Sequence, residues 1–479
     1  YTLCFINGEL ATESLNHFIY KDSITILDIG ELEDNSICST SSNFEKEAFF
    51  HLGLSTVKTG KYFEFHKGVK FENPIKIINI YNKSDKNLRI SSFNIFKLNE
   101  GNDISIIEKD VNEGSGSFNL NLNKFICPDN TILNHSMLYD DKTESNYLGY
   151  NYYDLGKSVL LNIDSMNINS NFNKNFIEVD LNKEGSEAKI NILNLARGDQ
   201  HLDNNILMNH NAEHCISFQN VRNILDDQAT CVFNGKVIVS QGAQKTDSNQ
   251  SNKNLLLSNS ATAHSNPQLE IYADDVKCGH GSTTGALDKE SIFYLRARGI
   301  NEQDANNILI KAFAKEILEE FFDDDIRNLS EDNLNHWDRW DKIVEKLSHI
   351  RDGFSFLDGQ DRLVYLIDLG KKIDLIDAKQ KVESNKVHAC TSQTWINLKN
   401  HDDITITADS ESAIVKGLLK ILQIGFNNQE KKNIIDFIDD FDEPIKIFEW
   451  LNIGPTISSQ RQNGFIGALL FIKKELINE

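Results

Sequence analysis

Cys390 stands in the stretch VHACTSQTWINLK, residues 387–399, just before a run of small polar residues. The polar run is typical of a solvated loop, and the residues from Trp395 onward alternate as in a β-strand. A cysteine on such a loop can ionise and be reached by a reaction partner, which a buried cysteine cannot. His388 is close in sequence, but no acid is placed to orient it, so a hydrolytic triad is not indicated. The residues alone leave two interpretations open: a nucleophile or carrier thiol, and a small residue of a core.

A second candidate is VKCGHGSTTG, residues 276–285, in which Cys278 and His280 are two apart. In a β-strand this spacing places both side chains on one face. A thiolate and an imidazole on one face can bind a soft metal or sulfide. A glycine-rich turn gives the same pattern without chemistry, so both interpretations stay open. The adjacent His214 and Cys215 would face opposite ways in a strand, and we expect a surface histidine and a buried cysteine.

Arg461 precedes the last expected helix, where it would hold a carboxylate, pair with a developing thiolate, or form a surface salt bridge. The sequence contains no P-loop, GxGxxG or HExxH motif, so no nucleotide or permanent metal site is expected. Seven cysteines without a CxxC pair favour a reducing compartment over a disulfide framework. The net charge of −22 disfavours a nucleic-acid partner, and no apolar run of about 18 residues predicts a membrane span.

Residues 1–275 contain short β-type runs separated by clusters of Asn, Asp, Gly and Ser, as expected for turns. Their spacing is irregular, and a sandwich, a barrel and a β-solenoid all fit. Residues 288–298 then predict a short helix, with Asp288 as its N-cap and Gly299 just past its end.

Residues 302–322 predict a second helix, whose apolar residues repeat every four positions: Leu309, Phe313, Ile317 and Phe321. This stripe must bury against a domain core or against a partner. The acidic, polar residues 323–335 are interpreted as a linker. Beyond them, residues 336–479 predict a compact α+β domain with a β-hairpin at 393–408 and a helix at 411–424, capped by Asp409 or Ser410.

Residues 198–325 resemble the core of the SufD family, scaffold subunits of the SUF iron–sulfur assembly machinery. The resemblance rests on stretches such as GDQHLDNNILMNHNAEHCISFQNV and PQLEIYADDVKCGHGSTTGALDKESIFYLRARGI. It implies a right-handed parallel β-helix for residues 1–285, followed by a helical segment at 286–322. It also implies that His280, with Cys278 beside it, holds a transient cluster, iron or sulfide.

The same resemblance implies two partners. The β-helix would pair with a SufB-like scaffold subunit, near whose interface the cluster would form. The C-terminal helices would dock on a SufC-like ATPase, and this assigns Phe313, Ile317 and Phe321 to that contact. Family members usually carry a further N-terminal helical region, which we expect to be missing here.

Residues 336–479 resemble the SufE family through DRLVYLIDLGKKI, VHACTSQTW, ADSESAIVKGLLKIL and ISSQRQNGFIGALLFIK, in that order. The resemblance implies that Cys390 accepts persulfide sulfur from a SufS-type cysteine desulfurase, with support from Arg461. It assigns Asp409 and Glu411 to the desulfurase contact. Three residues near the thiol depart from the family: Ala389 replaces Gly, Thr391 replaces Gln, and Thr394 replaces Val.

The combined expectation is a fusion of a SUF scaffold and a sulfur carrier, acting in a cytoplasm or an organelle without nucleic acid or membrane. The alternative is a structural adaptor that docks the desulfurase on the scaffold without carrying sulfur. The reactivity of the thiol at neutral pH separates the two.

Overall fold

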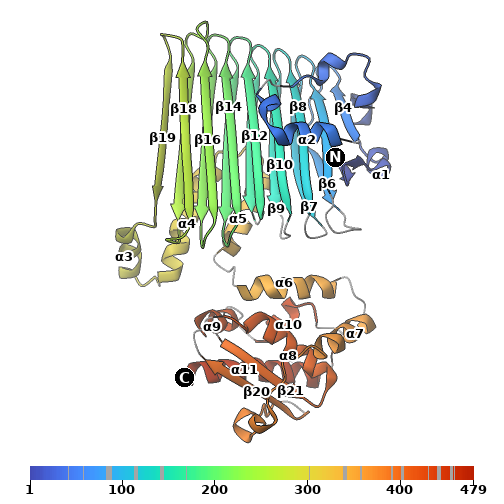
Figure 1. Ribbon diagram of the computed structural model, residues 1–479, viewed down its shortest axis with the longest axis vertical. Helices are drawn as coiled ribbons and strands as arrows, with labels where there is room; N and C mark the ends of the chain where they lie inside the picture. Colours follow the sequence, from blue (N-terminus) through green and yellow to red (C-terminus); the bar gives the residue numbers. More distant parts are fainter. Residues whose placement is uncertain are drawn as a thin grey trace. The chain divides into compact units, whose positions relative to one another are not determined.

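The computed structural model (Figure 1) describes residues 1–40, 43–57, 59–81, 89–112, 117–140, 145–168, 170–300, 302–337, 342–355, 359–389, 392–400, 404–429, 431–439, 444–453, 457 and 459–478. Contacts between residues divide the chain into two compact units, Tyr1–Asp332 and Asn333–Glu479. None of the described helices is both long enough and apolar enough to cross a lipid bilayer.

The N-terminal unit is a β-solenoid whose successive strands alternate between two sheets (Figure 1). The ten-stranded sheet contains β1 (Thr2–Ile6), β2 (Glu9–Leu10), β5 (Ile75–Tyr81), β7 (Asp103–Asn112), β9 (Ile132–Asp140), β11 (Leu160–Ile168), β13 (Glu187–Ala196), β15 (Ile216–Leu225), β17 (Asp247–Leu256) and β19 (Lys277–Gly285). The nine-stranded sheet contains β3 (Ile24–Asp28), β4 (Thr59–Phe65), β6 (Arg89–Lys97), β8 (Phe118–Cys127), β10 (Asn146–Leu155), β12 (Phe172–Leu181), β14 (His201–His210), β16 (Thr230–Val239) and β18 (Thr262–Ile271).

Apart from the pairs β1–β2 and β3–β4, the strands of both sheets pair in parallel. The expected parallel β-helix is confirmed, and this excludes the sandwich and the barrel. Turn residues with positive φ, such as Gly198 at 59° and Asp227 at 50°, reverse the chain between coils.

The solenoid interior contains a row of three asparagines, one from each of three successive coils. Asn194, Asn223 and Asn254 occupy equivalent positions on β13, β15 and β17. The Nδ2 of Asn194 donates to Oδ1 of Asn223 (2.7 Å), and Nδ2 of Asn223 donates to Oδ1 of Asn254 (2.6 Å). The Asn223 amide is bonded on both sides, so the row ties neighbouring coils together in one register.

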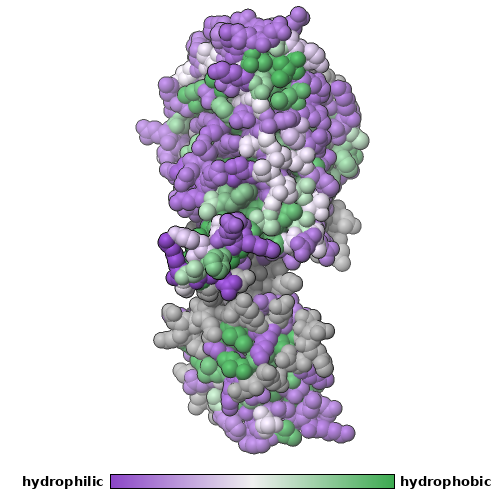
Figure 2. Space-filling model, turned by 90° about the vertical axis from the view of Figure 1, so that its left-hand side faces the viewer, coloured by the Kyte–Doolittle hydropathy of each residue, from purple (hydrophilic) through white to green (hydrophobic). Residues whose placement is uncertain are grey.

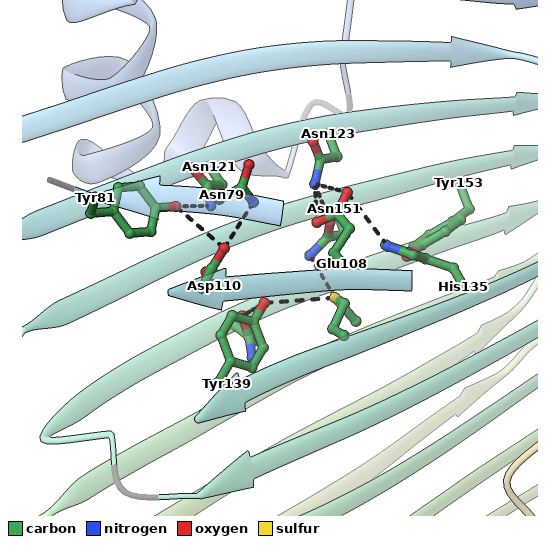
Figure 3. Close-up of polar contacts among 12 residues, drawn as sticks. Asn79, Tyr81, Glu108, Asp110, Asn121, Asn123, His135, Tyr139, Asn151 and Tyr153 are labelled. Atoms are coloured by element: carbon green, nitrogen blue, oxygen red, sulfur yellow. Dashed lines mark hydrogen bonds and ion pairs between the residues drawn. The ribbon is translucent and has the colours of Figure 1, made fainter. Parts of the chain in front are cut away.

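A second polar cluster fills the interior of the N-terminal coils (Figure 3). The hydroxyl of Tyr81 donates to Oδ1 of Asp110 (3.4 Å). Burial, and then the Asp110 carboxylate, hold the pKa of Tyr81 well above its usual range. Nδ1 of His135 lies 2.7 Å from the hydroxyl of Tyr153, and Nε2 lies 3.6 Å from Glu108. Nothing in the sequence pattern singled out these residues.

Helices α1 (Thr12–Asn16) and α2 (Ala48–Thr56) precede the regular coils, and α2 packs against β6 and β8. After β19 comes α3 (Lys289–Ala297), whose N-cap prediction is confirmed. The carboxylate of Asp288 accepts from the backbone N–H groups of Glu290 (3.3 Å) and Ser291 (2.9 Å). Gly299 follows the helix with φ of 91°, as a C-terminal glycine should.

Helix α4 (Glu302–Leu318) ends four residues earlier than the sequence predicts. The interpretation of residues 323–335 as a linker is corrected, because Asp324–Trp337 forms helix α5. The reason lies in residues that the acidic composition concealed: Ile326, Ser330 and Leu334 repeat every four positions and are buried. The Oγ of Ser330 also donates to the carbonyl oxygen of Ile326 (2.6 Å), which satisfies the buried hydroxyl.

The C-terminal unit has the predicted α+β composition. Its elements are α6 (Lys342–Ser355), α7 (Gly359–Gly370), β20 (Thr394–Asn400), β21 (Ile404–Ser410), α8 (Ala413–Phe426), α9 (Lys431–Asp439), α10 (Pro444–Trp450) and α11 (Ser459–Asn478). Strands β20 and β21 form the predicted antiparallel hairpin. The capping prediction for α8 was wrong: the N-cap is Ser412, which accepts from the N–H of Val415 (3.4 Å). Asp409 and Ser410 belong to β21 instead.

Candidate functional site

The first candidate site lies at the end of the solenoid formed by β18 and β19. Strand β19 pairs with β17 and is the edge of its sheet. Cys278 is in register with the buried Ser248, and His280 is in register with the buried Gln250. Both side chains therefore lie on the face of β19 that turns toward the solenoid interior, as the Cys-X-His spacing predicts.

The two side chains differ in burial. Cys278 is half-buried and packs on the hydrophobic core, whereas His280 is exposed. Burial raises the pKa of the Cys278 thiol, and a hydrogen bond from the backbone of Ser248 offsets part of that rise. Among the residues that the structure describes, no group of three or more His, Cys, Asp or Glu is placed to hold a metal ion. This chain thus offers two ligand-type side chains at an exposed sheet edge.

The space-filling view from the β19 side shows what surrounds this edge (Figure 2). Weakly polar and hydrophobic residues form a pale and green band among hydrophilic neighbours. Exposed large side chains of this end include Ile271 at 40% and Tyr272 at 62%. An unpaired edge with apolar residues beside it is the kind of surface that another chain covers.

The second candidate site is the segment around Cys390, and Cys390 and Thr391 lie outside the described residues. The chain on either side is held in place. The backbone N–H of Val387 donates to the carbonyl oxygen of Thr394 (2.9 Å). The N–H of Glu411 donates to the carbonyl oxygen of Gln393 (3.1 Å). The candidate thiol therefore belongs to a short connection whose two ends are fixed to each other and to β21.

Thr394 is the buried anchor of this connection. Its Oγ1 donates to the carbonyl oxygen of Ser392 (3.0 Å) and lies 2.9 Å from Oγ of Ser410. Ser410 in turn accepts from the N–H of Ser412 (3.3 Å). Because a hydroxyl has one proton, Ser410 must donate to Thr394 while Thr394 donates to Ser392. Thr394, which stands where the SufE family usually has Val, therefore completes a chain of hydrogen bonds. The chain runs from Ser412, at the start of α8, through Ser410 and Thr394 to Ser392.

The charged residues predicted near the thiol fall in different environments. Arg461 is exposed on the first turns of α11, and Glu411 is exposed between β21 and α8. The Asp409 carboxylate accepts from Nζ of Lys381 (2.5 Å) and from Nζ of Lys416 (2.9 Å). Partial burial raises the pKa of Asp409, but the bonds from the two lysines outweigh it and bring the pKa below its usual range. Asp409 is thus engaged within the chain, whereas the Glu411 side chain is exposed.

The apolar stripe of α4 is largely buried against the solenoid. Ile317 and Phe321 are each 1% exposed, and Phe313 lies under the guanidinium of Arg222, 5.0 Å from ring centroid to Cζ. Nearby, Arg222 pairs with Glu316 (2.6 Å). Of the two interpretations of the stripe, the domain core is confirmed. Because Ile317 and Phe321 are buried within the N-terminal unit, their side chains are not exposed for contact with an ATPase.

The remaining cysteine–histidine pair behaves as expected. Cys215 is fully buried, while His214 is exposed in a turn with φ of 57°.

Family models match both units of the chain. Residues 81–313 match the model "SUF system FeS cluster assembly, SufBD core domain". Residues 348–476 match the SufE model, "Fe-S metabolism associated domain". Among curated proteins, the iron-sulfur cluster assembly protein SufD of Escherichia coli is 32% identical over 291 residues, which cover 59% of this chain and 68% of that protein. The chain belongs to the SufBD family.

Other SufBD relatives match over smaller shares. An iron-sulfur cluster assembly SufBD family protein of Synechocystis is 32% identical over 42% of this chain and 45% of its own length. A chloroplastic protein of Arabidopsis thaliana, ABCI7, is 26% identical over 56% of this chain and 58% of its own length. The chain therefore spans between about half and two thirds of these relatives, and joins their SufBD core to a SufE domain.

Sequence reasoning missed the interior of the SufBD core. The amide rows that lead to β19, including Gln219 and Gln250, lie about 30 residues apart in the chain. A search for Asn or Gln recurring at that interval on β-type runs would have found them. The cluster around Glu108 and His135 carries no comparable sequence signal.

Proposed function

We propose that the chain is a SUF assembly protein that unites a cluster scaffold with its own sulfur carrier. The observation that carries the proposal is the presence of a SufBD core and a SufE domain in one chain. Linking two modules raises the effective concentration of one at the other without any new contact. Sulfur accepted by the C-terminal unit is then local to the scaffold that consumes it.

In the proposed transfer, the Cys390 thiolate attacks the outer, sulfane sulfur of a desulfurase persulfide. The bond between the two sulfurs of that persulfide breaks, and the desulfurase cysteine leaves as a thiolate. Cys390 becomes the persulfide, so one sulfur–sulfur bond replaces another and no external oxidant is needed. The exposed Glu411 is available for the desulfurase contact, and the exposed Arg461 for support of the thiolate.

On the scaffold side, His280 and Cys278 are proposed ligands for the nascent cluster or its iron, which are substrates of the assembly reaction. Imidazole nitrogen and thiolate sulfur are suitable donors for iron. Two donors do not complete a site, so the rest must come from a partner. A SufB-like subunit pairing at the outer edge of β19 would supply them and would cover that edge.

A SufC-like ATPase is proposed to contact α3 instead of the buried stripe of α4. No residue of α3 is buried, and Phe293 and Tyr294 are 74% and 55% exposed. Aromatic side chains of this size are frequent anchors of protein interfaces. Under this proposal the ATPase contact lies on the helical segment, while Ile317 and Phe321 stay in the core.

The carrier role is tested by incubating the protein with a cysteine desulfurase and sulfur-labelled cysteine, without reductant. Wild type is expected to hold label that a thiol reductant releases, and Cys390→Ser is expected to lose it. The matched control is Cys4→Ser, which alters a partly buried thiol of the solenoid. Label on Cys390→Ser at the wild-type level would contradict the carrier role and favour the docking adaptor.

The scaffold role is tested by His280→Ala in the complex with SufB-like and SufC-like subunits. Cluster yield per complex, read from the visible absorption, is expected to fall. His264→Ala is the control, because His264 is exposed on the neighbouring strand β18. Unchanged yield in His280→Ala, with the complex intact, would remove His280 from the mechanism.

A further inference from the structure

A row of carboxamides leads through the solenoid interior to His280. Gln219 on β15 and Gln250 on β17 are in register, and Gln250 is in register with His280 on β19. Gln219 and Gln250 are 0% and 1% exposed. Nε2 of Gln250 donates to Oε1 of Gln219 (3.1 Å). Residues in register on neighbouring parallel strands have side chains about 5 Å apart, so the Gln250 carboxamide lies beside His280.

The bond to Gln219 engages the nitrogen of the Gln250 carboxamide and leaves its oxygen for another partner. Within the described part of the chain, Oε1 of Gln250 is buried and has no hydrogen-bond partner. A buried oxygen left without a donor is destabilising, so this atom calls for a donor.

The neighbouring positions on β17 show that such bonds between the last two strands do form. Nδ2 of Asn254 donates to Oγ1 of Thr284 (3.1 Å). The hydroxyl of Ser282 donates instead to Oγ of Ser265 (2.7 Å) and lies at a long 3.5 Å from Oδ1 of Asn252. The row of asparagines thus ends on an acceptor of β19, whereas the row of glutamines ends on an oxygen that needs a donor. The β19 residue in register with that oxygen is His280, whose imidazole carries one N–H when neutral.

We propose that Gln250 is a positioning residue for His280. The exposed imidazole would turn so that its ring N–H reaches Oε1 of Gln250, a bond that the described side-chain positions do not contain. This bond selects one tautomer and aims the other ring nitrogen, with its lone pair, at the cluster or iron. Metal-binding histidines commonly donate their second ring nitrogen to an acceptor in this way, and loss of the acceptor typically costs about 10–100-fold in metal affinity. The inference rests on the proposed role of His280 and adds the group that orients it.

The first test reads the imidazole directly, in the full chain without iron. Nitrogen NMR of protein labelled at histidine reports which ring nitrogen carries the proton, and His280→Gln assigns the signals. Wild type is expected to show one tautomer of neutral His280, and Gln250→Leu a mixture of both. Asn252→Leu is the matched control, since Asn252 is a buried amide one inward position away on β17 and in register with Ser282. It is expected to leave the His280 signals unchanged.

A conservative variant separates orientation from packing. Gln250→Glu keeps an acceptor oxygen at the same reach and is expected to retain the single tautomer. Identical His280 tautomers in wild type and in a folded Gln250→Leu would overturn the proposal, and would assign Oε1 of Gln250 to a buried water.

The second test adds ferrous iron and the partner subunits and separates this inference from the proposed function. Cluster yield in Gln250→Leu is expected to fall by about tenfold, toward that of His280→Ala. A tautomer shift in Gln250→Leu with full cluster yield in His280→Ala would support the positioning contact and refute the ligand role. Loss of yield in His280→Ala with an unchanged tautomer in Gln250→Leu would support the ligand role of His280 and refute the positioning contact.

Discussion

Ala389, the residue before Cys390, packs directly on Gly467 in the middle of α11. A Cβ placed on Gly467 would lie 2.4 Å from Cβ of Ala389 and 3.5 Å from Cγ1 of Val387. Carbon atoms in contact prefer about 3.5–4.0 Å, so no larger residue fits at Gly467 without movement. The methyl that distinguishes Ala389 from the glycine usual in SufE proteins is accommodated because Gly467 has none.

Gly467→Ala should therefore displace the segment that carries Cys390. We expect sulfur uptake from a desulfurase to fall between about tenfold and a hundredfold, because small misplacements of a reacting group have effects of that size. The double variant Ala389→Gly with Gly467→Ala exchanges the two methyls and should restore most of the uptake. Labelled-sulfur transfer and the rate of thiol alkylation measure both variants.

Gly425→Ala supplies the matched control for this exchange. Gly425 is also a buried helical glycine, and a Cβ there would lie 3.1 Å from side-chain atoms of Leu347, away from Ala389. It should lower stability by overpacking without changing the reactivity of Cys390. If Gly467→Ala reacts like wild type, the contact does not position the thiol.

The Thr394 hydroxyl should stabilise the C-terminal unit. Thr394→Val keeps the shape but removes the proton donated to Ser392 and the acceptor used by Ser410. We expect the free energy of unfolding to fall by about 1–3 kcal/mol, the usual cost of leaving buried polar groups unsatisfied. All four tryptophans lie at or after position 337, so tryptophan fluorescence during urea unfolding reports this unit. Thr394→Ser keeps the hydroxyl, so its free energy of unfolding should fall by less than that of Thr394→Val. Equal stability of wild type and Thr394→Val would contradict the hydrogen-bond chain.

Local signals in the sequence predicted local structure well. Asp288 caps α3, Gly299 follows it, and the hairpin of β20 and β21 forms where polar and apolar residues alternate. These features depend on residues within one turn of each other, which sequence patterns record directly.

The choice of solenoid over sandwich or barrel could not come from periodicity, because all three place alternate residues of a strand inside. It came from the family resemblance. The coil repeat stays hidden because the interior accepts different side chains at one position, as His280, Gln250, Gln219 and Ile190 show in a single row. Each interior position requires a hydrogen bond or a packing contact with the equivalent position of the next coil, and several residue types provide one.

Long-range packing decided the features that the sequence predicted incorrectly. Residues 323–335 were interpreted as a linker because most of them are acidic or polar. The two buried apolar residues, Ile326 and Leu334, are eight positions apart, and only this spacing indicates a helix. Asp409 could not cap α8 because Lys381 and Lys416, 28 residues before and seven after it in the chain, engage its carboxylate. The position of Gln250 beside His280 likewise depends on coil register, which no local signal contains.

Asp164 should make the N-terminal unit less stable as the pH rises from about 4 to about 6. This carboxylate of β11 is 1% exposed and accepts from the N–H of Phe322 (2.8 Å), which follows α4, and from Nδ2 of Asn191 (2.9 Å). Burial raises its pKa to about 6, against about 3.9 in an unfolded chain. Between these values the folded state binds the proton more tightly, so its contribution to stability is full below about pH 4 and lost above about pH 6.

Asp164→Asn removes this proton and should flatten the dependence, which for the wild type is on the order of 2–3 kcal/mol across the window. Thermal unfolding followed by far-ultraviolet circular dichroism at pH 4.5 and 7 measures the difference. Asp199→Asn, at an exposed turn position, should retain the wild-type difference. A wild-type difference in Asp164→Asn would show that this carboxylate does not titrate in the window.

The Asp409 carboxylate should act in the opposite direction. Because its pKa in the folded chain is lowered, its stabilising effect is present above the unfolded value of about 3.9 and is lost as the pH falls through the lower folded value. Asp409→Asn should destabilise the C-terminal unit by about 1 kcal/mol at pH 7 and by less near pH 3, measured by urea unfolding with tryptophan fluorescence. Glu411→Gln, two residues on and exposed, should leave stability unchanged and instead weaken binding to the desulfurase. If Asp409→Asn weakens that binding while Glu411→Gln does not, the two residues have the reverse roles, with Asp409 at the partner surface.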